Sequence, residues 1–473
     1  MSLFTTTALA ASLLAAGTKD NPVIAWNNLA ASATLSTEFG AAAAGNPEAN
    51  AVSGSTFDKW RGVPSVDEIA LRATLAAATP ADFIAVAAHN LAKIGAGIVP
   101  QTAGASRTNL ITRSQDFSAS WVSNQATMSP NVVDGPDGSL SGARIVETAT
   151  TAPHYVANSV SVAYTSGTDY TISIFVRRSV GARHFGIALP SAVFGATVSV
   201  AFNLSSPAAT IEVAGTATTA GIEAYSASAS GATFYRCWVK SRATATASST
   251  GVSFLISNST SDGNPAYLGD GSSALVLWGA QVEQGALTSY VRTTTAAASS
   301  SWYDWAPWVI PATGGVVAWR FPEVSAATWR VLIRGVSPSV IPSIGVFFIG
   351  KAMILPQRFY QGFSPPITPT DVDLQSNVSA GNNLLGTSVT VRGSTLSLAV
   401  EHLSDAFVRG PDWAGFQEHF NIGKGAFLAW RPTKYPQDIW YFWRDGAAIR
   451  PVNSGPKAYM SAPLSARVHE AEA

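Results

Sequence analysis

Five aromatic residues in the middle of the chain have the chemistry of a sugar-binding site. Aromatic rings can stack on the apolar face of a sugar, while nearby amide, carboxylate and guanidinium groups satisfy its hydroxyls. For each of these residues, packing in a hydrophobic core is the alternative interpretation. The candidates are Trp121, Tyr155, Tyr164, Tyr235 and Trp238.

Motifs of the common catalytic centres do not occur in the sequence. There is no nucleophile elbow, His-Glu-x-x-His zinc motif, P-loop or dinucleotide fingerprint. Ile422–Gly425 is similar to the end of a P-loop, but Glu418 stands where that loop needs its first glycine, so we expect this segment to end a helix. We expect no catalytic residue and no enzyme. Glycoside hydrolysis needs only two correctly separated carboxylates, for which the alternatives are Asp116, Glu147, Glu283 and Asp304.

Few residues of the sequence are suited to binding a metal ion or to redox chemistry. None of the six histidines pairs with another at metal-ligand spacing, and His89 is expected to form hydrogen bonds at the edge of a core. The single cysteine, Cys237, excludes a disulfide framework within the chain and is expected to be buried. We expect no cofactor. A structural calcium ion is the alternative to ordinary turn chemistry at Asp134, Asp137 and Asp270.

The composition restricts the class of protein further. The 473 residues are enough for about three domains. Only 12% are charged, against roughly 25% in ordinary globular chains, and the formal net charge is zero without a basic stripe, so nucleic acid is not an expected partner. Residues 1–17 are apolar but lack a positive region before Lys19, which favours an arm over a secretory signal. No uninterrupted apolar run reaches the ~20 residues of a membrane span, so membrane insertion is not expected.

Short strands are the main predicted elements. Tyr170–Val176 alternates with period two, and Val252–Ile256 and Ala274–Trp278 are similar, with glycine turns between such runs. This pattern predicts a sandwich or jelly roll over residues 105–295. The flanking segments 21–104 and 296–355 each hold too few strands for a sandwich, which favours one host sandwich interrupted by an insertion, with independent small domains as the alternative.

The two ends of the chain complete the predicted organisation. Residues 1–20 form the N-terminal arm, and residues 356–473 form a small aromatic-rich α+β domain that docks to a larger assembly. In the latter, Pro411 opens a helix that places Trp413, Phe416 and Phe420 on one face. A hairpin is expected over Val389–Val400, centred on Arg392-Gly393, and flexible linkers over residues 101–106 and 293–301. The predicted fold class is therefore mainly β.

Two sets of segments carry a resemblance to known families. Residues 105–295 resemble a carbohydrate-binding-like jelly roll of tailed-phage tail fibres, and the flanks resemble tail structural proteins with a discoidin-like sandwich and a C-terminal aromatic domain. The loop Ser379–Gly386 departs from the more acidic pattern of those relatives. The first resemblance rests on Asn109–Phe117, Trp121, Tyr170–Val176, Phe234–Cys237, Leu277–Gly285 and Thr288–Val291. The second rests on Thr56–Trp60, Asp82–Leu91, Trp329–Ile333, Ile344–Ala352 and Phe427–Pro432.

The resemblance implies a structural protein of a tailed-phage or gene-transfer virion, at the tail tip, a fibre or a spike. Its expected partners are other tail proteins and a host cell-surface glycan bound by the outward jelly roll. Homo-oligomers of three- or six-fold symmetry are expected by analogy with tails. A purely architectural subunit without a specific ligand is the alternative, followed by a secreted or tail-borne polysaccharide hydrolase.

Overall fold

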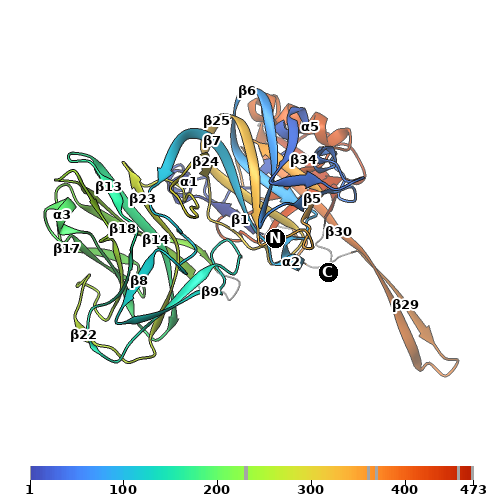
Figure 1. Ribbon diagram of the computed structural model, residues 1–473. Helices are drawn as coiled ribbons and strands as arrows, with labels where there is room; N and C mark the ends of the chain where they lie inside the picture. The colour runs from blue at the N-terminus through green and yellow to red at the C-terminus, as the bar shows by residue number, and fades with distance from the viewer. Residues whose placement is uncertain (1, 228–232, 360–362, 368–370, 455–458, 470–473) are drawn as a thin grey trace. The chain divides into compact units, whose positions relative to one another are not determined.

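The computed structural model describes residues 2–227, 233–359, 363–367, 371–454 and 459–469. Strands hold 52% of these residues and helices 9%, so the predicted mainly β class is confirmed. The chain divides into two compact units (Figure 1). The inserted unit is Gly97–Ile310, and the host unit combines Met1–Ala96 with Pro311–Ala473.

The inserted unit is built on two antiparallel six-stranded sheets, which we call sheet I and sheet II. Sheet I has the order β18 (Thr219–Ala227), β19 (Thr233–Arg242), β14 (Asp169–Val180), β23 (Ala274–Gln284), β10 (Gly142–Glu147), β9 (Ala126–Val133). Sheet II has the order β17 (Ala208–Val213), β16 (Ser199–Asn203), β15 (His184–Ala188), β21 (Ser253–Ser257), β12 (His154–Asn158), β8 (Trp121–Asn124). The shorter elements are β11 (Thr151–Ala152), β13 (Val162–Tyr164), β20 (Ala247–Ser249), β22 (Tyr267–Leu268) and α3 (Ser191–Phe194).

Period-two alternation explains the two cores of this unit. Along β14, Ile172 and Ile174 belong to the large core that both sheets supply, whereas Phe175 belongs to a second core on the other face of sheet I. Trp278 and Tyr290 complete this second core. Cys237 is buried in the large core, as predicted.

The two ends of the inserted unit pair with each other. Strand β7 (Gly97–Asn109) is antiparallel to β24 (Ala298–Asp304), with Thr102 opposite Tyr303. The Arg107 guanidinium lies 4.2 Å from the centre of the Tyr303 ring. The expectation of flexible linkers is therefore wrong for residues 101–106 and 298–301, because small polar residues pair in a ladder as readily as they form loops.

The host unit places strands from both flanks side by side. The long strand β6 (Glu68–Ala87) pairs with β25 (Val316–Arg334), β27 (Val346–Gly350) and β3 (Thr34–Glu38). Residues of the expected arm form β1 (Ser2–Thr5), which runs parallel to β25, and the helix α1 (Thr7–Ala15). A small sheet has the order β26 (Ser343–Ile344), β5 (Trp60–Pro64), β4 (Gly40–Ala42). Short helical turns are η1 (Leu29–Ser32), η2 (Glu48–Val52), α2 (Leu91–Ile94) and α4 (Asp405–Val408).

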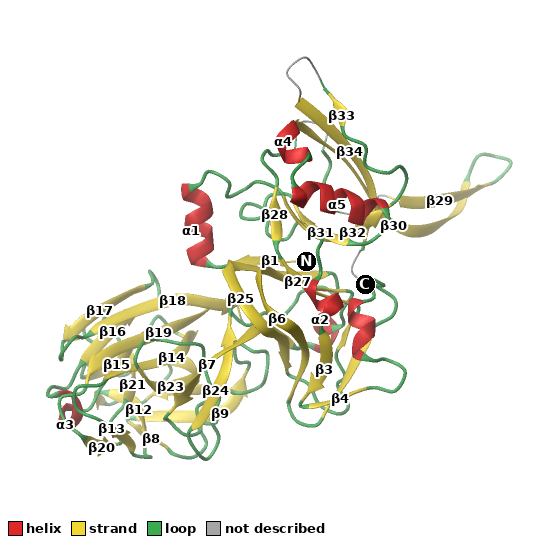
Figure 2. Ribbon diagram, turned by 90° about the horizontal axis from the view of Figure 1, so that it is seen from above, coloured by secondary structure: helices red, strands yellow, loops and turns green. Residues whose placement is uncertain are grey.

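The C-terminal segment shares a sheet with the N-terminal one. Its order is β28 (Ala352–Ile354), β2 (Val23–Ala25), β31 (Ala426–Ala429), β32 (Ile439–Arg444), β34 (Tyr459–Val468), β30 (Leu384–Ser404), β29 (Asp371–Val378), and β33 (Val452–Asn453) pairs with β34. The predicted helix is confirmed as α5 (Pro411–Asn421), and it buries Trp413, Phe416 and Phe420. Figure 2 shows α5 beside β31 and β32, whose side chains belong to the same core.

The hairpin predicted around Arg392-Gly393 is wrong. Strand β30 continues through this point: its first half pairs with β29 and its second half with β34. Gly393 has a φ of 106°, so it lets the strand change partner instead of reversing direction. The β29–β30 ribbon turns near Asn382 and exposes five large apolar side chains, Leu374, Val378, Leu384, Leu385 and Val389. Among the described residues, no helix has the length and apolar character needed to cross a membrane.

Candidate functional site

Two of the five predicted sugar-binding aromatics lie in the large core of the inserted unit. Trp121 stacks 4.7 Å from Phe117, and its indole nitrogen donates to the carbonyl of Arg113 at 3.1 Å. Tyr164 is 2% exposed and packs edge-on against Tyr170. Burial raises the pKa of Tyr164 above its ordinary value. Both rings therefore pack in the hydrophobic core, which was the alternative interpretation of these residues.

Tyr235 and Trp238 lie on the same strand but on opposite faces. Tyr235 packs against the large core, whereas Trp238 covers Gly221 on the other face of sheet I. A Cβ atom at Gly221 would lie 2.7 Å from the Trp238 ring, so the glycine makes room for the indole. The alternation of side chains along β19 keeps these two rings from forming one site.

Tyr155 is the predicted residue that lines a surface pocket. It points outward from β12, and the pocket beside it has a volume of about 290 Å³. Its polar lining is neutral, since it consists of the side chains of Ser191, Thr197, Ser253 and Asn264. The pocket therefore combines one aromatic ring with hydroxyl groups and an amide.

Close backbone contacts hold the Asn264 side of this pocket. A Cβ atom at Gly263 would lie 2.6 Å from the backbone of Val200, so the loop lies directly on sheet II. The Gly263 amide donates to the Glu212 carboxylate at 3.0 Å, and Ser199 donates to the same oxygen at 2.6 Å. This bonding fixes the loop that presents Asn264 to the pocket.

The carboxylates considered for hydrolysis all have structural partners. Glu147 is buried and accepts hydrogen bonds from Arg183, from the Tyr267 hydroxyl at 2.5 Å and from the Asp270 amide at 2.8 Å. Glu283 accepts from Gln281 and from Thr288. Asp116 pairs with Arg113, and Asp304 accepts from Gln101.

Of the three aspartates considered for calcium, Asp137 and Asp270 follow turn chemistry. Asp137 accepts from the backbone and hydroxyl of Ser139, and Asp270 accepts from Ser272 and Ser273. The hydrogen bonds from Ser273 hold the pKa of Asp270 well below its usual range. Within the described ranges, no cluster of three or more His, Cys, Asp or Glu side chains has the arrangement of a metal site.

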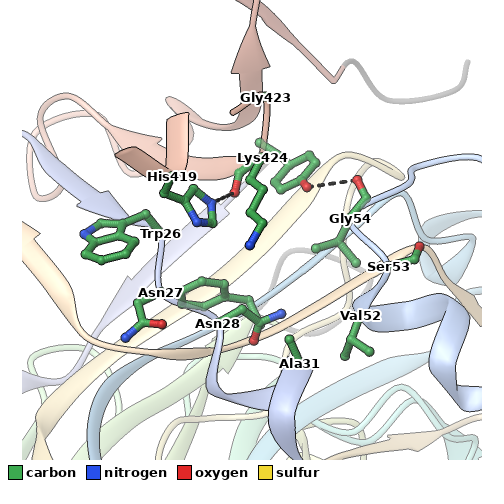
Figure 3. Close-up of a pocket in the computed structure, with 14 residues that line it drawn as sticks. Trp26, Asn27, Asn28, Ala31, Val52, Ser53, Gly54, His419, Gly423 and Lys424 are labelled. Carbon is green, nitrogen blue, oxygen red and sulfur yellow. Dashed lines mark hydrogen bonds between the residues drawn. The ribbon is translucent and has the colours of Figure 1, made fainter. Parts of the chain in front are cut away.

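A second, larger pocket lies in the host unit and was not predicted. Its volume is about 410 Å³ (Figure 3). Trp26 follows β2, His419 lies on α5, and Lys424 lies in the turn between α5 and β31. Ser53 and Gly54 after η2 form another wall.

Hydrogen bonds and two glycines set the geometry of this host pocket. His419 donates from Nε2 to the carbonyl of Gly425 at 2.9 Å, and its ring centre lies 5.5 Å from that of Trp26. Because the carbonyl can only accept, Nδ1 is the unprotonated nitrogen of a neutral His419. Burial, and to a lesser extent Lys424, lowers the pKa of His419 and so favours this neutral form. The Tyr441 hydroxyl donates to the carbonyl of Gly54 at 3.0 Å and fills the space that a side chain at Gly425 would need.

The residue pattern of Ile422–Gly425 predicted only the end of a helix. That assignment is confirmed, because α5 ends at Asn421 and Gly423 has a φ of 85°. The turn has a second role, since it also carries Lys424 at the pocket. Its signal in the sequence is a basic residue between two glycines, directly after an amphipathic helix.

Comparisons with known proteins add little to these sites. A scan of protein-family models and a search of curated proteins found no match. One solved structure that matches is the Clostridium thermocellum N-terminal endo-1,4-β-D-xylanase 10B, CBM22-1 and GH10 modules, complexed with xylohexaose. The identity is 13% and the TM-score 0.22, and the match covers 40% of this chain and 30% of the xylanase chain. The chain thus spans less than a third of that protein, and a similarity this weak supports no assignment of ligand or activity.

Proposed function

We propose that this protein is a non-catalytic structural component of a tailed-phage virion, located at the tail tip, a fibre or a spike, whose inserted unit binds glycans of the host surface. The resemblance of both sets of segments to tail proteins supports the virion role. The neutral pocket beside Tyr155 is the observation that carries the ligand assignment.

The pocket chemistry suits an uncharged sugar. Tyr155 offers a ring for stacking, and Ser191, Thr197 and Asn264 offer groups that both donate and accept hydrogen bonds. The part of the chain that the structure describes places no charged side chain in the pocket lining, so its selectivity would come from shape and hydrogen bonding. Such a shallow site binds weakly, and linked copies on one particle would raise the avidity by ~10²–10⁴.

Binding of the full-length chain to a glycan array and to whole host cells tests the ligand assignment. Tyr155→Ala is expected to reduce the affinity of saturable binding about fivefold, in line with the ~1 kcal/mol of one stacking contact. Val122→Ala is the matched control, because Val122 is 54% exposed on the same sheet but outside the pocket. Equal binding by both variants would contradict the site, and no binding even by a multivalent display would favour the architectural alternative.

The virion role and the absence of catalysis need separate measurements. Mass spectrometry of purified tail particles is expected to find this chain in a fixed ratio to the other tail subunits. A reducing-sugar assay on the bound glycan is expected to show no product. Release of product that Glu147→Gln abolishes, in a variant shown to be folded, would instead support the hydrolase alternative.

A further inference from the structure

The host pocket, which the proposed function does not use, has an excess of unused hydrogen-bond donors. The amide oxygen of Asn28 accepts from the backbone of Ala30 and Ile349, and its nitrogen donates to the carbonyl of Phe347, so both polar atoms of this side chain have partners. Ser53 donates to the carbonyl of Asn50 and is equally engaged. Among the described residues, the polar side-chain groups of Trp26, Asn27 and Lys424, all of which line the pocket, have no hydrogen-bond or ion-pair partner.

The charge in this pocket has one sign. Lys424 is exposed, and no Asp or Glu is found among the described residues that line the pocket. Figure 3 shows its side chain extending from the turn into the space between Trp26 and Val52. A cation without a counter-charge in the described lining, with the N–H groups of Trp26 and Asn27 in the same lining, favours a ligand that carries a negative, hydrogen-bond-accepting group. Trp26 and Asn27 also line a neighbouring pocket, where Asp82, Glu323 and Asp412 are found.

The Trp26 ring in the lining of the pocket indicates which kind of anion would fit. Trp26 is half-buried, and its ring is held by His419 on α5 and by close contact with Gly415, where a Cβ atom would lie 2.5 Å from the indole. A fixed indole beside an amide side chain is suited to the apolar face and the hydroxyls of a sugar ring. The volume of about 410 Å³ lies within the range of small-molecule sites and accommodates a monosaccharide.

We propose that the host pocket is a second binding site, specific for a carboxylate-bearing sugar: Lys424 pairs with the carboxylate, the Trp26 ring stacks on the sugar, and the Asn27 amide binds a hydroxyl. This site is independent of the neutral pocket beside Tyr155. One chain would therefore recognise an uncharged and an acidic sugar at separate places, as a heteropolysaccharide of mixed composition presents them.

Titration calorimetry or saturation-transfer NMR on the full chain tests this site with methyl β-glucuronide, its uncharged counterpart methyl β-glucoside, and acetate. The glucuronide is expected to bind about tenfold more tightly than the glucoside, as one charge-assisted hydrogen bond allows. Lys424→Gln is expected to remove this preference without changing the fold, because the side chain is exposed. Lys93→Gln, which changes an exposed lysine of α2 outside the pocket, is expected to keep it.

The possible results separate the proposals. Equal binding of glucuronide and glucoside by the full chain carrying Tyr155→Ala, in which the neutral pocket does not contribute, would overturn the site. No binding of either sugar, or an unchanged preference when Lys424→Gln is added, would overturn it as well. Acetate that competes as well as the glucuronide would overturn the sugar specificity and leave a simple anion site. Tyr155→Ala is expected to leave glucuronide binding unchanged, so a failure of the neutral pocket is distinguishable from a failure of this one.

Discussion

Burial of a neutral histidine makes the host unit sensitive to acid. His89 follows β6, its side chain is 4% exposed, and neither of its ring nitrogens has a hydrogen-bond partner among the described residues. Burial is the main cause that lowers the pKa of His89 to about 3, and the nearby charges of His469 and Lys59 act in the same direction. The expectation of a hydrogen-bonded histidine at this position was therefore wrong.

The size of the effect follows from proton linkage. In the unfolded chain, histidine titrates near pKa ~6.5, so at about pH 5 the unfolded state holds the proton and the folded state does not. The stabilisation from a neutral His89 is complete above about pH 6.5 and decreases as the pH falls toward 3. A pH of about 5 lies about 1.5 pH units below the pKa of histidine in the unfolded chain. The free energy of unfolding of the host unit is therefore expected to be about 2 kcal/mol lower there than at neutral pH.

The contribution of His89 is measured by comparing the pH dependence of unfolding in the wild type and in a variant without this histidine. Urea unfolding of the wild type and of His89→Phe is compared at about pH 7.5 and about pH 5, with hydrogen–deuterium exchange of β6 peptides to follow the host unit separately. The wild type is expected to lose about 2 kcal/mol more than His89→Phe between these two values. His402→Gln, at an exposed position, serves as the control and is expected to behave as the wild type. Equal losses in the wild type and His89→Phe would refute the reasoning.

Three further predictions concern the inserted unit and the ribbon. Glu147→Gln leaves Arg183 without its buried charge partner and is expected to destabilise the inserted unit by about 3 kcal/mol in scanning calorimetry. Gly263→Ala places a Cβ atom 2.6 Å from the backbone of Val200, so it is expected to cost about 1–3 kcal/mol and to weaken glycan binding at the Tyr155 pocket. Leu384→Asp, at a side chain that is 66% exposed on the apolar ribbon, is expected to reduce self-association in sedimentation velocity without lowering the melting temperature.

The elements that sequence patterns predicted correctly are those that depend on local alternation. Tyr170–Val176 alternates strictly between two buried faces, so its strand could be recognised without knowledge of its neighbours. The helix α5 was also predictable, because Pro411 opens it, three aromatic residues define one face and Gly423 follows its end. In both segments the local signals agree with the packing.

The errors occurred where distant partners decide the structure. Gly393 carries the positive φ of a turn residue, yet β34 supplies a partner about seventy residues further along the chain and the strand continues. Residues 101–106 have the composition of a linker, but they pair with β24, which lies about two hundred residues away. Local composition cannot distinguish these outcomes, because the hydrogen bonds that decide them are not local.

The host pocket could not be predicted for the same reason. It joins Trp26 to Lys424 across almost the full length of the chain, through the pairing of β2 with β31. Three of the five sugar-binding candidates, Trp121, Tyr164 and Tyr235, instead pack against the large core of the inserted unit. Aromatic residues in a β-rich chain are core residues by default, and only the fold shows which rings remain accessible.

The low charge of the chain bears both on its stability and on the sugar binding proposed for its two pockets. Several of the few charged residues are used in structural pairs within one unit, such as Glu147 with Arg183, Glu38 with Arg330, and Glu68 with Arg334. The polar and aromatic groups that line both pockets are mostly neutral, and such groups can bind sugars by stacking and neutral hydrogen bonds. We therefore expect Lys424 to have a large effect on selectivity, because the described residues that line its pocket include no carboxylate to compensate its charge. Removing that one charge should therefore change which sugars are bound, whereas removing an exposed charge elsewhere should not.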